Sequence, residues 1–169
     1  NDIHRRYLYK IRQSEKHRRG SKHNDKISVH IWFINSQGEF LLQQRLPSAK
    51  KFPNMWGQTG GGAQTGESSW DACCRESIEE LGITPEIDKS IWIGTFKRPK
   101  DFVDVWLVYC DVDINDLKLQ PDEVQNAKWA SIDEIEQMQK DGTFIPSILP
   151  GLNMIKSYFD MIKLFNKSV

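Results

Sequence analysis

Three glutamates, Glu76, Glu79 and Glu80, lie close together in a segment that predicts a helix. Each helical residue advances the chain by about 100°, so the three carboxylates share an arc of roughly 100° and face one another. Like charges at this spacing destabilise a helix by a few tenths of a kcal/mol per pair. Such crowding favours a divalent cation, and Mg²⁺ prefers carboxylate oxygens and commonly binds beside substrate phosphates. The alternative is an ordinary solvated acidic face.

A glycine-rich turn directly before this helix favours the metal site over the solvated face. The run Thr59-Gly60-Gly61-Gly62 lets backbone groups approach a ligand closely, and a turn carbonyl is a further oxygen ligand. The side of the helix opposite the glutamates carries larger apolar residues, and we expect it to face the core. These residues are Trp70, Cys74, Ile78 and Leu81.

The stretch from Gly61 to Ile83 resembles the sequence box of the Nudix hydrolase family, G-x5-E-x7-R-E-U-x-E-E-x-G-U, where U is apolar. Every fixed position is matched, by Gly61, Glu67, Arg75, Glu76, Glu79, Glu80 and Gly82, and the last U is Ile83. Ser77 departs from the pattern at the first U, and we expect its hydroxyl to bond back to the carbonyl of Cys73. The resemblance covers roughly residues 27 to 140.

This resemblance implies the fold, the reaction and the roles of several residues. The fold is an α/β fold, an α/β/α sandwich with a mixed sheet. The metal ligands are Glu76, Glu79, Glu80 and the carbonyl of Gly60, while Glu67 pairs with Arg75. The cofactor is Mg²⁺, for which Mn²⁺ can substitute. The reaction is attack of water on a phosphorus of a nucleoside diphosphate linked to another moiety, or of a related organic pyrophosphate.

The general base varies within the family, so it is one of the box glutamates, Glu79 or Glu80, or an acid from a later loop. Glu123, in a loop before a short strand, is our later candidate, and the alternative is an ordinary exposed acid. Stacking partners for the substrate are Trp56, Phe96 and Trp106, although aromatic residues on strands usually belong to the core. Candidates for binding phosphate oxygens are Arg45, Lys97 and Arg98. His30 is expected to be a hydrogen-bonded sheet histidine, and a catalytic role for His4 stays open.

Two other functions compete with hydrolysis. Four segments resemble the branch of the family related to isopentenyl-diphosphate isomerases, namely 30–35, 41–45, 52–56 and 124–135. Those isomerases carry a catalytic cysteine shortly after the tryptophan of the loop, whereas Gly57-Gln58-Thr59-Gly60 follows Trp56 here, which argues against isomerase chemistry. The second alternative is a catalytically inactive nucleotide-binding module, which the intact set of box glutamates disfavours.

The elements that must position these residues can be read along the chain. We predict a hairpin of strands at 27–34 and from residue 40, a broken loop over 47–66, and a helix that starts after Ser68 and stops at Gly82. Strands follow at 91–96, 102–112 and 127–129, then helices at 132–140 and 152–165. We therefore predict a basic arm over residues 1 to 26 and a single domain over 27 to 169.

Composition places the chain among globular proteins. It has 169 residues, no net formal charge, and nine Lys or Arg against three acids in the predicted arm. The arm could hold RNA, but a solvated or dimer-docking segment is favoured. No run is apolar enough for a membrane span or a secretory signal, so we expect a cytoplasmic protein, monomeric or homodimeric. The three cysteines, Cys73, Cys74 and Cys110, are expected to be reduced thiols.

Overall fold

The computed structural model describes residues 26–167, with side chains described up to residue 164. The predicted basic arm and His4 lie outside the described residues, apart from Lys26, which opens the first strand. No helix in the described part of the chain is long and apolar enough to cross a membrane.

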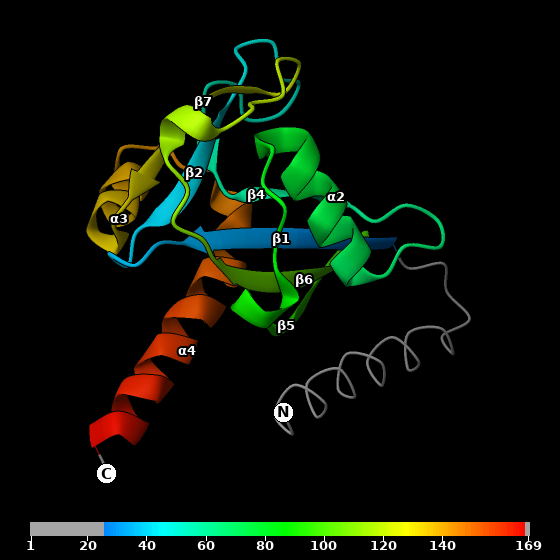
Figure 1. Cartoon of the computed structure of the whole chain (residues 1–169). Helices are drawn as coiled ribbons and strands as arrows, with labels where there is room; N and C mark the ends of the chain where they lie inside the picture. Colours follow the sequence, from blue (N-terminus) through cyan, green and yellow to red (C-terminus); the bar gives the residue numbers. More distant parts are fainter. Residues whose placement is uncertain (1–25, 168–169) are drawn as a thin grey trace.

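A mixed β-sheet forms the centre of the molecule (Figure 1). Its strands are β1 (Lys26–Ile34), β2 (Phe40–Arg45), β3 (Trp56–Gly57), β4 (Thr59–Gly62), β5 (Ser90–Arg98), β6 (Asp101–Tyr109) and β7 (Val124–Ala130). The main path of the sheet runs β3-β2-β1-β6-β5, while β4 pairs with β1 and β7 pairs with β2. The pairing of β1 with β6 is parallel, and the other pairings are antiparallel.

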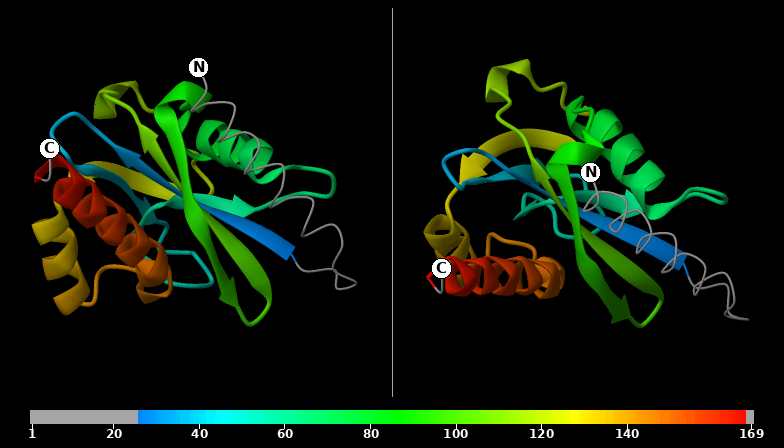
Figure 2. Two further views of the ribbon diagram at one scale, coloured as in Figure 1. Left: turned by 90° about the horizontal axis from the view of Figure 1, so that it is seen from below. Right: turned by 60° about the horizontal axis from the view of Figure 1, so that its bottom comes forward.

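Helices cover both faces of this sheet, which confirms the predicted α/β/α sandwich (Figure 2). On one face lies α2 (Ser69–Leu81), and on the other lie α3 (Ile132–Lys140) and α4 (Leu149–Lys167). Short 3₁₀ turns at Ile87–Lys89, Ile114–Asp116 and Pro146–Ile148 connect the elements. Alternate residues of β1 serve the two faces, because successive side chains of a strand point to opposite sides.

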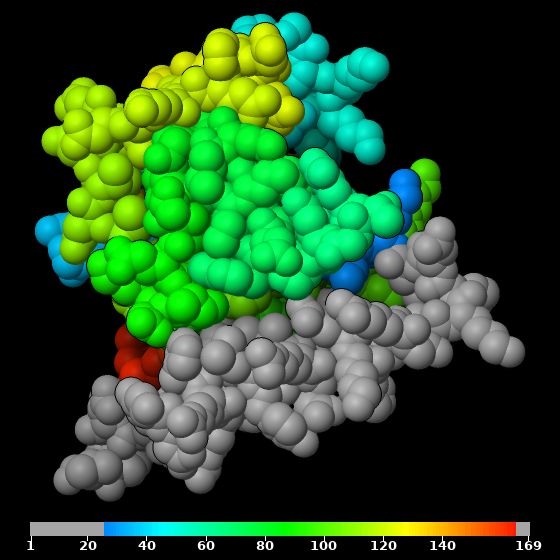
Figure 3. Space-filling model, turned by 45° about the vertical axis from the view of Figure 1, so that its right-hand side comes forward, coloured from blue at the N-terminus to red at the C-terminus, as the bar shows by residue number. Residues whose placement is uncertain are grey.

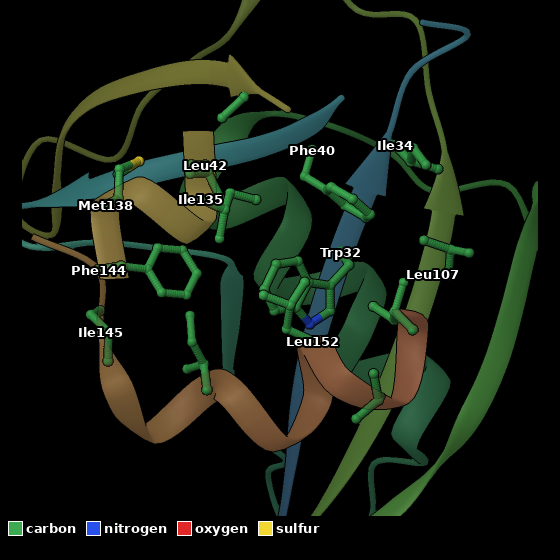
Figure 4. Close-up of a cluster of buried hydrophobic side chains, with 14 residues drawn as sticks. Trp32, Ile34, Phe40, Leu42, Leu107, Ile135, Met138, Phe144, Ile145 and Leu152 are labelled. Carbon is green, nitrogen blue, oxygen red and sulfur yellow. The ribbon is translucent and has the colours of Figure 1, made fainter. Parts of the chain in front are cut away.

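Each face has its own apolar core. Between the sheet and helices α3 and α4, the buried side chains include Trp32, Phe40, Leu107, Ile135 and Leu152 (Figure 4). Between the sheet and α2, the core includes Val29, Ile31, Phe33, Trp106 and Leu81. The α2 side holds the glutamates, so this second core is the platform of the candidate site.

The loop predicted over residues 47–66 is partly wrong, because two short strands, β3 and β4, lie within it. They were missed because Gly57, Gly60, Gly61 and Gly62 have little strand propensity by themselves. Backbone pairing of β4 with β1 and of β3 with β2 holds these segments as strands. Strand β4 thereby presents the glycine turn directly to α2.

Helix α2 begins and ends where the sequence predicts. Ser68 is its N-cap, and Ser68 and Asp71 form a reciprocal capping box. Gly82 ends the helix with φ of 72°, a left-handed conformation that glycine adopts without a Cβ clash. The Ser77 hydroxyl donates to the Cys73 carbonyl at 2.7 Å, as predicted.

The predicted core-facing side of α2 is confirmed only in part. Leu81 is buried and Trp70 packs against the core, but the prediction is wrong for Ile78. Ile78 is 48% exposed, whereas Glu80 is 3% exposed. The buried side is instead built from small residues, Ser69, Ala72, Cys73 and Ser77, together with Leu81. Small side chains allow the helix to approach the sheet closely, and Ser69 accepts a hydrogen bond there from the indole of Trp106 at 2.9 Å. The buried face of α2 therefore includes Glu80, whose side chain points towards the sheet.

Candidate metal and catalytic site

Arg75 organises the exposed part of the glutamate cluster. Its Nε and Nη2 donate to the two carboxylate oxygens of Glu67 at 2.7 and 3.0 Å, so the predicted ion pair is present and bidentate. Nη1 donates to Glu76 at 2.8 Å and to Glu79 at 3.1 Å, and Nη2 also donates to the Gly62 carbonyl at 2.9 Å. One guanidinium thus ties the loop, the glycine turn and two box glutamates together. It lowers the pKa of Glu67.

Glu80 points the other way, into the space between α2 and the sheet. Its Oε2 accepts a hydrogen bond from Gln43 Nε2 at 2.8 Å and from the backbone N–H of Gly60 at 3.3 Å. The pKa of Glu80 is raised to about 8, chiefly by burial and in addition by the negative charges of Glu76 and Glu123, while these two hydrogen bonds oppose the change. Glu80 is therefore a buried carboxylate whose charged form is costly in the metal-free protein.

Glu123 lies on a loop that two backbone hydrogen bonds hold against this cluster. The N–H of Gln120 donates to the Glu80 carbonyl at 3.0 Å, and the N–H of Leu46 donates to the Glu123 carbonyl at 3.2 Å. Figure 3 shows this segment, in yellow, and the loop around residue 50, in cyan, beside the surface of α2. The side chain of Glu123 is exposed, and its charge raises the pKa of both Glu76 and Glu80.

The glycine turn leaves room that no other residue would leave. A Cβ on Gly61 would lie 2.2 Å from Glu76 Oε1 and 2.7 Å from Oε2, and a Cβ on Gly60 would lie 2.2 Å from the Val29 carbonyl oxygen. The carboxylate of Glu76 therefore rests directly on the backbone at Gly61. By contrast, a Cβ on Gly62 would meet nothing within 4 Å.

The chemistry of this donor set fits a hard divalent cation, since carboxylate and carbonyl oxygens are its preferred ligands. Glu76, Glu80 and Glu123 repel one another, and burial raises the pKa of Glu76 as well as that of Glu80. Nevertheless, in residues 26–167 no three His, Cys, Asp or Glu side chains form a ready-made metal cluster. The expectation that all three box carboxylates face one another is therefore wrong. Arg75 donates hydrogen bonds to Glu76 and Glu79, whereas Gln43 and the backbone of Gly60 donate to Glu80.

The three aromatic candidates have different surroundings. Trp106 is fully buried and packs against Trp70 with ring centroids 5.0 Å apart, so it is a core residue rather than a stacking partner. Phe96 is half-buried and forms a T-shaped aromatic pair with His30, with ring centroids 5.6 Å apart. Trp56 is half-buried and lies under the ammonium of Lys128 at 5.1 Å.

The cationic candidates are all engaged with the protein. Arg45 Nε donates to the Lys51 carbonyl at 3.0 Å, and Arg98 forms an ion pair with Asp101. The ammonium of Lys97 lies 5.3 Å from the ring centroid of Phe102. The structure therefore brings none of the three into contact with the box glutamates.

His30 is a buried sheet residue, as predicted, but its Nδ1 has no hydrogen-bond partner among the described residues. Burial lowers the pKa of His30 to about 4, the charge of Arg98 lowers it as well, and Asp101 partly opposes this change. All three cysteines are free thiols, and burial raises the pKa of Cys73 most strongly. These properties suit packing rather than nucleophilic chemistry.

Two residues of the site were missed by sequence analysis, Gln43 and Thr59. Both are buried, and they connect the sheet to Glu80. The available signal was the position of Gln43 two residues after Leu41, which places a polar side chain on a core-facing side of β2. A buried amide needs a partner, and here that partner is a box glutamate.

Sequence comparisons with known proteins show which family the chain is similar to. Residues 25–150 match the family model described as the NUDIX domain. The chain is 32% identical over 141 residues to an uncharacterized Nudix hydrolase of Listeria monocytogenes, covering 83% of this chain and 77% of the relative. It is also 32% identical over 119 residues to an isopentenyl-diphosphate Delta-isomerase of Citrobacter koseri, covering 66% of this chain and 65% of the relative.

Solved structures show the same fold. A protein of Deinococcus radiodurans superimposes with a TM-score of 0.64 at 23% identity, covering 83% of this chain and 89% of the other. The NUDIX domain of Shewanella oneidensis NrtR, solved with ADP ribose, also gives 0.64, at 16% identity and covering 86% and 97% of the two chains. The match to the family model over most of the chain, together with the identity to curated relatives, shows that the chain belongs to the Nudix hydrolase family and is a pyrophosphohydrolase.

Proposed function

We propose that this protein is a Mg²⁺-dependent enzyme that hydrolyses the diphosphate linkage of a nucleoside diphosphate joined to another moiety, or of a related organic pyrophosphate. The observation that carries this proposal is the buried carboxylate of Glu80, held beside Glu76 and Glu123 against the glycine turn of β4. Mutually repelling carboxylates at that depth are stabilised by a bound cation. Mn²⁺ is expected to substitute for Mg²⁺.

The residues that would hold the metal are Glu76, Glu79, Glu80 and the carbonyl of Gly60. When bound, Mg²⁺ neutralises negative charge on the diphosphate and orients the reacting oxygens. Arg75 and Glu67 hold the loop and the glutamates Glu76 and Glu79 in place. Glu123 is our candidate for the group that accepts the proton of the attacking water, with Glu79 and Glu80 as the alternatives within the box. The loop of Glu123 is anchored by hydrogen bonds to α2 and to Leu46, the residue directly after β2.

Isomerisation of a prenyl diphosphate is the second candidate, because a relative at 32% identity is named as such an isomerase. The segment Gly57-Gln58-Thr59-Gly60, which follows Trp56, has no cysteine to carry out that chemistry. Hydrolysis needs a water molecule and the cation that the carboxylates would hold, but no cysteine. We therefore favour hydrolysis.

The test is cleavage of the diphosphate linkage in a substrate panel, followed by chromatography of the phosphorylated products, with Mg²⁺ and with EDTA, for the wild type and Glu79→Gln. The panel contains nucleoside triphosphates, dinucleoside polyphosphates, ADP-ribose, sugar nucleotides and prenyl diphosphates. We expect metal-dependent cleavage of at least one compound, lost in Glu79→Gln, and the best substrate then identifies the second moiety. Binding without turnover would indicate a nucleotide-binding module. Double-bond migration with the diphosphate left intact would indicate an isomerase.

A further inference from the structure

A chain of three buried polar groups runs from β4 through β2 to α2. Thr59 Oγ1 donates to Gln43 Oε1 at 3.2 Å, and Gln43 Nε2 donates to Glu80 Oε2 at 2.8 Å. All three side chains are nearly inaccessible, with Thr59 1%, Gln43 7% and Glu80 3% exposed. Buried hydrogen bonds of this kind fix side-chain orientation, because each partner loses its alternative bonds to water.

Which group donates and which accepts in these hydrogen bonds follows from the chemistry of the three side chains. A metal-binding carboxylate is ionised and only accepts hydrogen bonds, so the amide nitrogen of Gln43 faces Glu80 in the form that binds a cation. The amide oxygen of Gln43 then faces Thr59, whose hydroxyl supplies the donor that this oxygen requires. Thr59 thereby stabilises the orientation of the Gln43 amide that the carboxylate of Glu80 sets. A flipped amide would place its oxygen against the carboxylate of Glu80, where the two acceptors would repel each other.

Both donors that Glu80 meets act on the same carboxylate oxygen. Gln43 Nε2 and the N–H of Gly60 both approach Oε2, the latter at 3.3 Å. Among the described residues, no hydrogen bond reaches the other carboxylate oxygen of Glu80, Oε1. The carboxylate is thus anchored through one oxygen, and the other is left for a ligand.

We infer that Gln43 is a positioning residue, supported by Thr59, which anchors Glu80 through Oε2 so that Oε1 is the oxygen presented to the cation. This inference rests on the proposed function for the identity of the ligand. The residues are contributed by three separate elements, so the anchor also fixes the distance between α2 and the sheet. Loss of such an outer hydrogen bond typically lowers metal affinity or activity by about 10- to 100-fold.

The experiment compares Gln43→Met, which keeps the chain length but removes the amide, with Thr59→Val and Thr59→Ser. Thr59→Val removes the hydroxyl at nearly constant shape, whereas Thr59→Ser keeps it and is the matched control. Mn²⁺ binding is measured by electron paramagnetic resonance in the absence of substrate. Values of kcat and KM are then measured on the best substrate of the panel, and circular dichroism on heating reports folding.

We expect Gln43→Met to weaken Mn²⁺ binding and to lower kcat, each by about 10-fold or more, with KM little changed. Thr59→Val should move both quantities in the same direction by a smaller factor, and Thr59→Ser should restore them. A purely structural role would change the melting temperature without this pattern. If Gln43→Met fails to fold, the Thr59 pair decides the question.

Folded Gln43→Met and Thr59→Val proteins with wild-type Mn²⁺ affinity and kcat would overturn the inference. A wild type that binds Mn²⁺ but cleaves nothing would instead remove the hydrolase proposal. In that case a weaker affinity in Gln43→Met would still support the positioning role. A wild type that binds no Mn²⁺ would overturn both.

Discussion

Replacing Glu80 by Gln is expected to abolish metal-dependent hydrolysis while making the metal-free protein more stable. Glu80 is proposed as a direct ligand, so its loss should lower kcat by more than the roughly 100-fold that loss of an outer-shell group costs. The neutral amide, however, avoids burying a charge between α2 and the sheet. Activity and stability should therefore move in opposite directions.

The stability gain should depend on pH, with a sign set by the raised pKa of Glu80. In the folded metal-free protein this pKa is about 8, against an ordinary value of 4.5. Below about pH 4.5 the carboxyl is protonated in both the folded and the unfolded chain. As the pH rises towards 8, the unfolded chain loses this proton and the folded chain retains it, so the free energy of unfolding of the wild type falls. Glu80→Gln lacks this titration.

Thermal melts in EDTA from pH 5 to pH 8.5 measure this effect. The melting temperature of Glu80→Gln minus that of the wild type should increase with pH, since each kcal/mol corresponds to about 2–4 °C for a chain of this size. The wild type alone should gain stability on addition of Mg²⁺ at pH 8. A melting-temperature difference that stays constant across this pH range would mean that the pKa of Glu80 is not raised by burial in the folded protein.

Replacing Gly61 by Ala should also cost more than about 100-fold in kcat, although the protein should still fold. The new Cβ would lie 2.2 Å from Glu76 Oε1 and 2.4 Å from its carboxylate carbon. The carboxylate is the far end of a flexible side chain, so it can swing away without unfolding the protein. It would then leave the position from which it is proposed to bind metal.

Gly62→Ala is the matched control for this prediction. It adds the same methyl group one residue later, where a Cβ meets nothing within 4 Å. Activity of Gly62→Ala should stay within a few-fold of the wild type. Assays of kcat, Mn²⁺ affinity and melting temperature for both variants decide the matter. Equal losses in the two variants would show that the turn as a whole, rather than the contact with Glu76, limits activity.

The sequence predicts the framework of the site well because that framework is governed by local rules. Ser68 and Asp71 fix the start of α2, Gly82 fixes its end, and the charge of Arg75 demands the acid that Glu67 supplies. Strand and helix order follow from periodicity, and the α/β/α arrangement follows from that order together with the family resemblance.

The remainder depends on how closely elements approach one another, which one chain's residue pattern does not specify. Apolarity alone placed Ile78 in the core, yet the small side chains of Ala72, Cys73 and Ser77 let α2 sit against the sheet on a different arc. Glu80 is buried as a consequence. Its partner Gln43 is 37 residues away in sequence, and no local rule connects the two.

The most direct test of the central claim is turnover of the best substrate in ¹⁸O-labelled water, with Mg²⁺ and with EDTA. Attack of water on phosphorus predicts one ¹⁸O atom in a phosphoryl product, formed with Mg²⁺ and not formed in EDTA. Turnover in EDTA equal to that with Mg²⁺, or a product that carries no ¹⁸O on phosphorus, would contradict metal-dependent hydrolysis at this site.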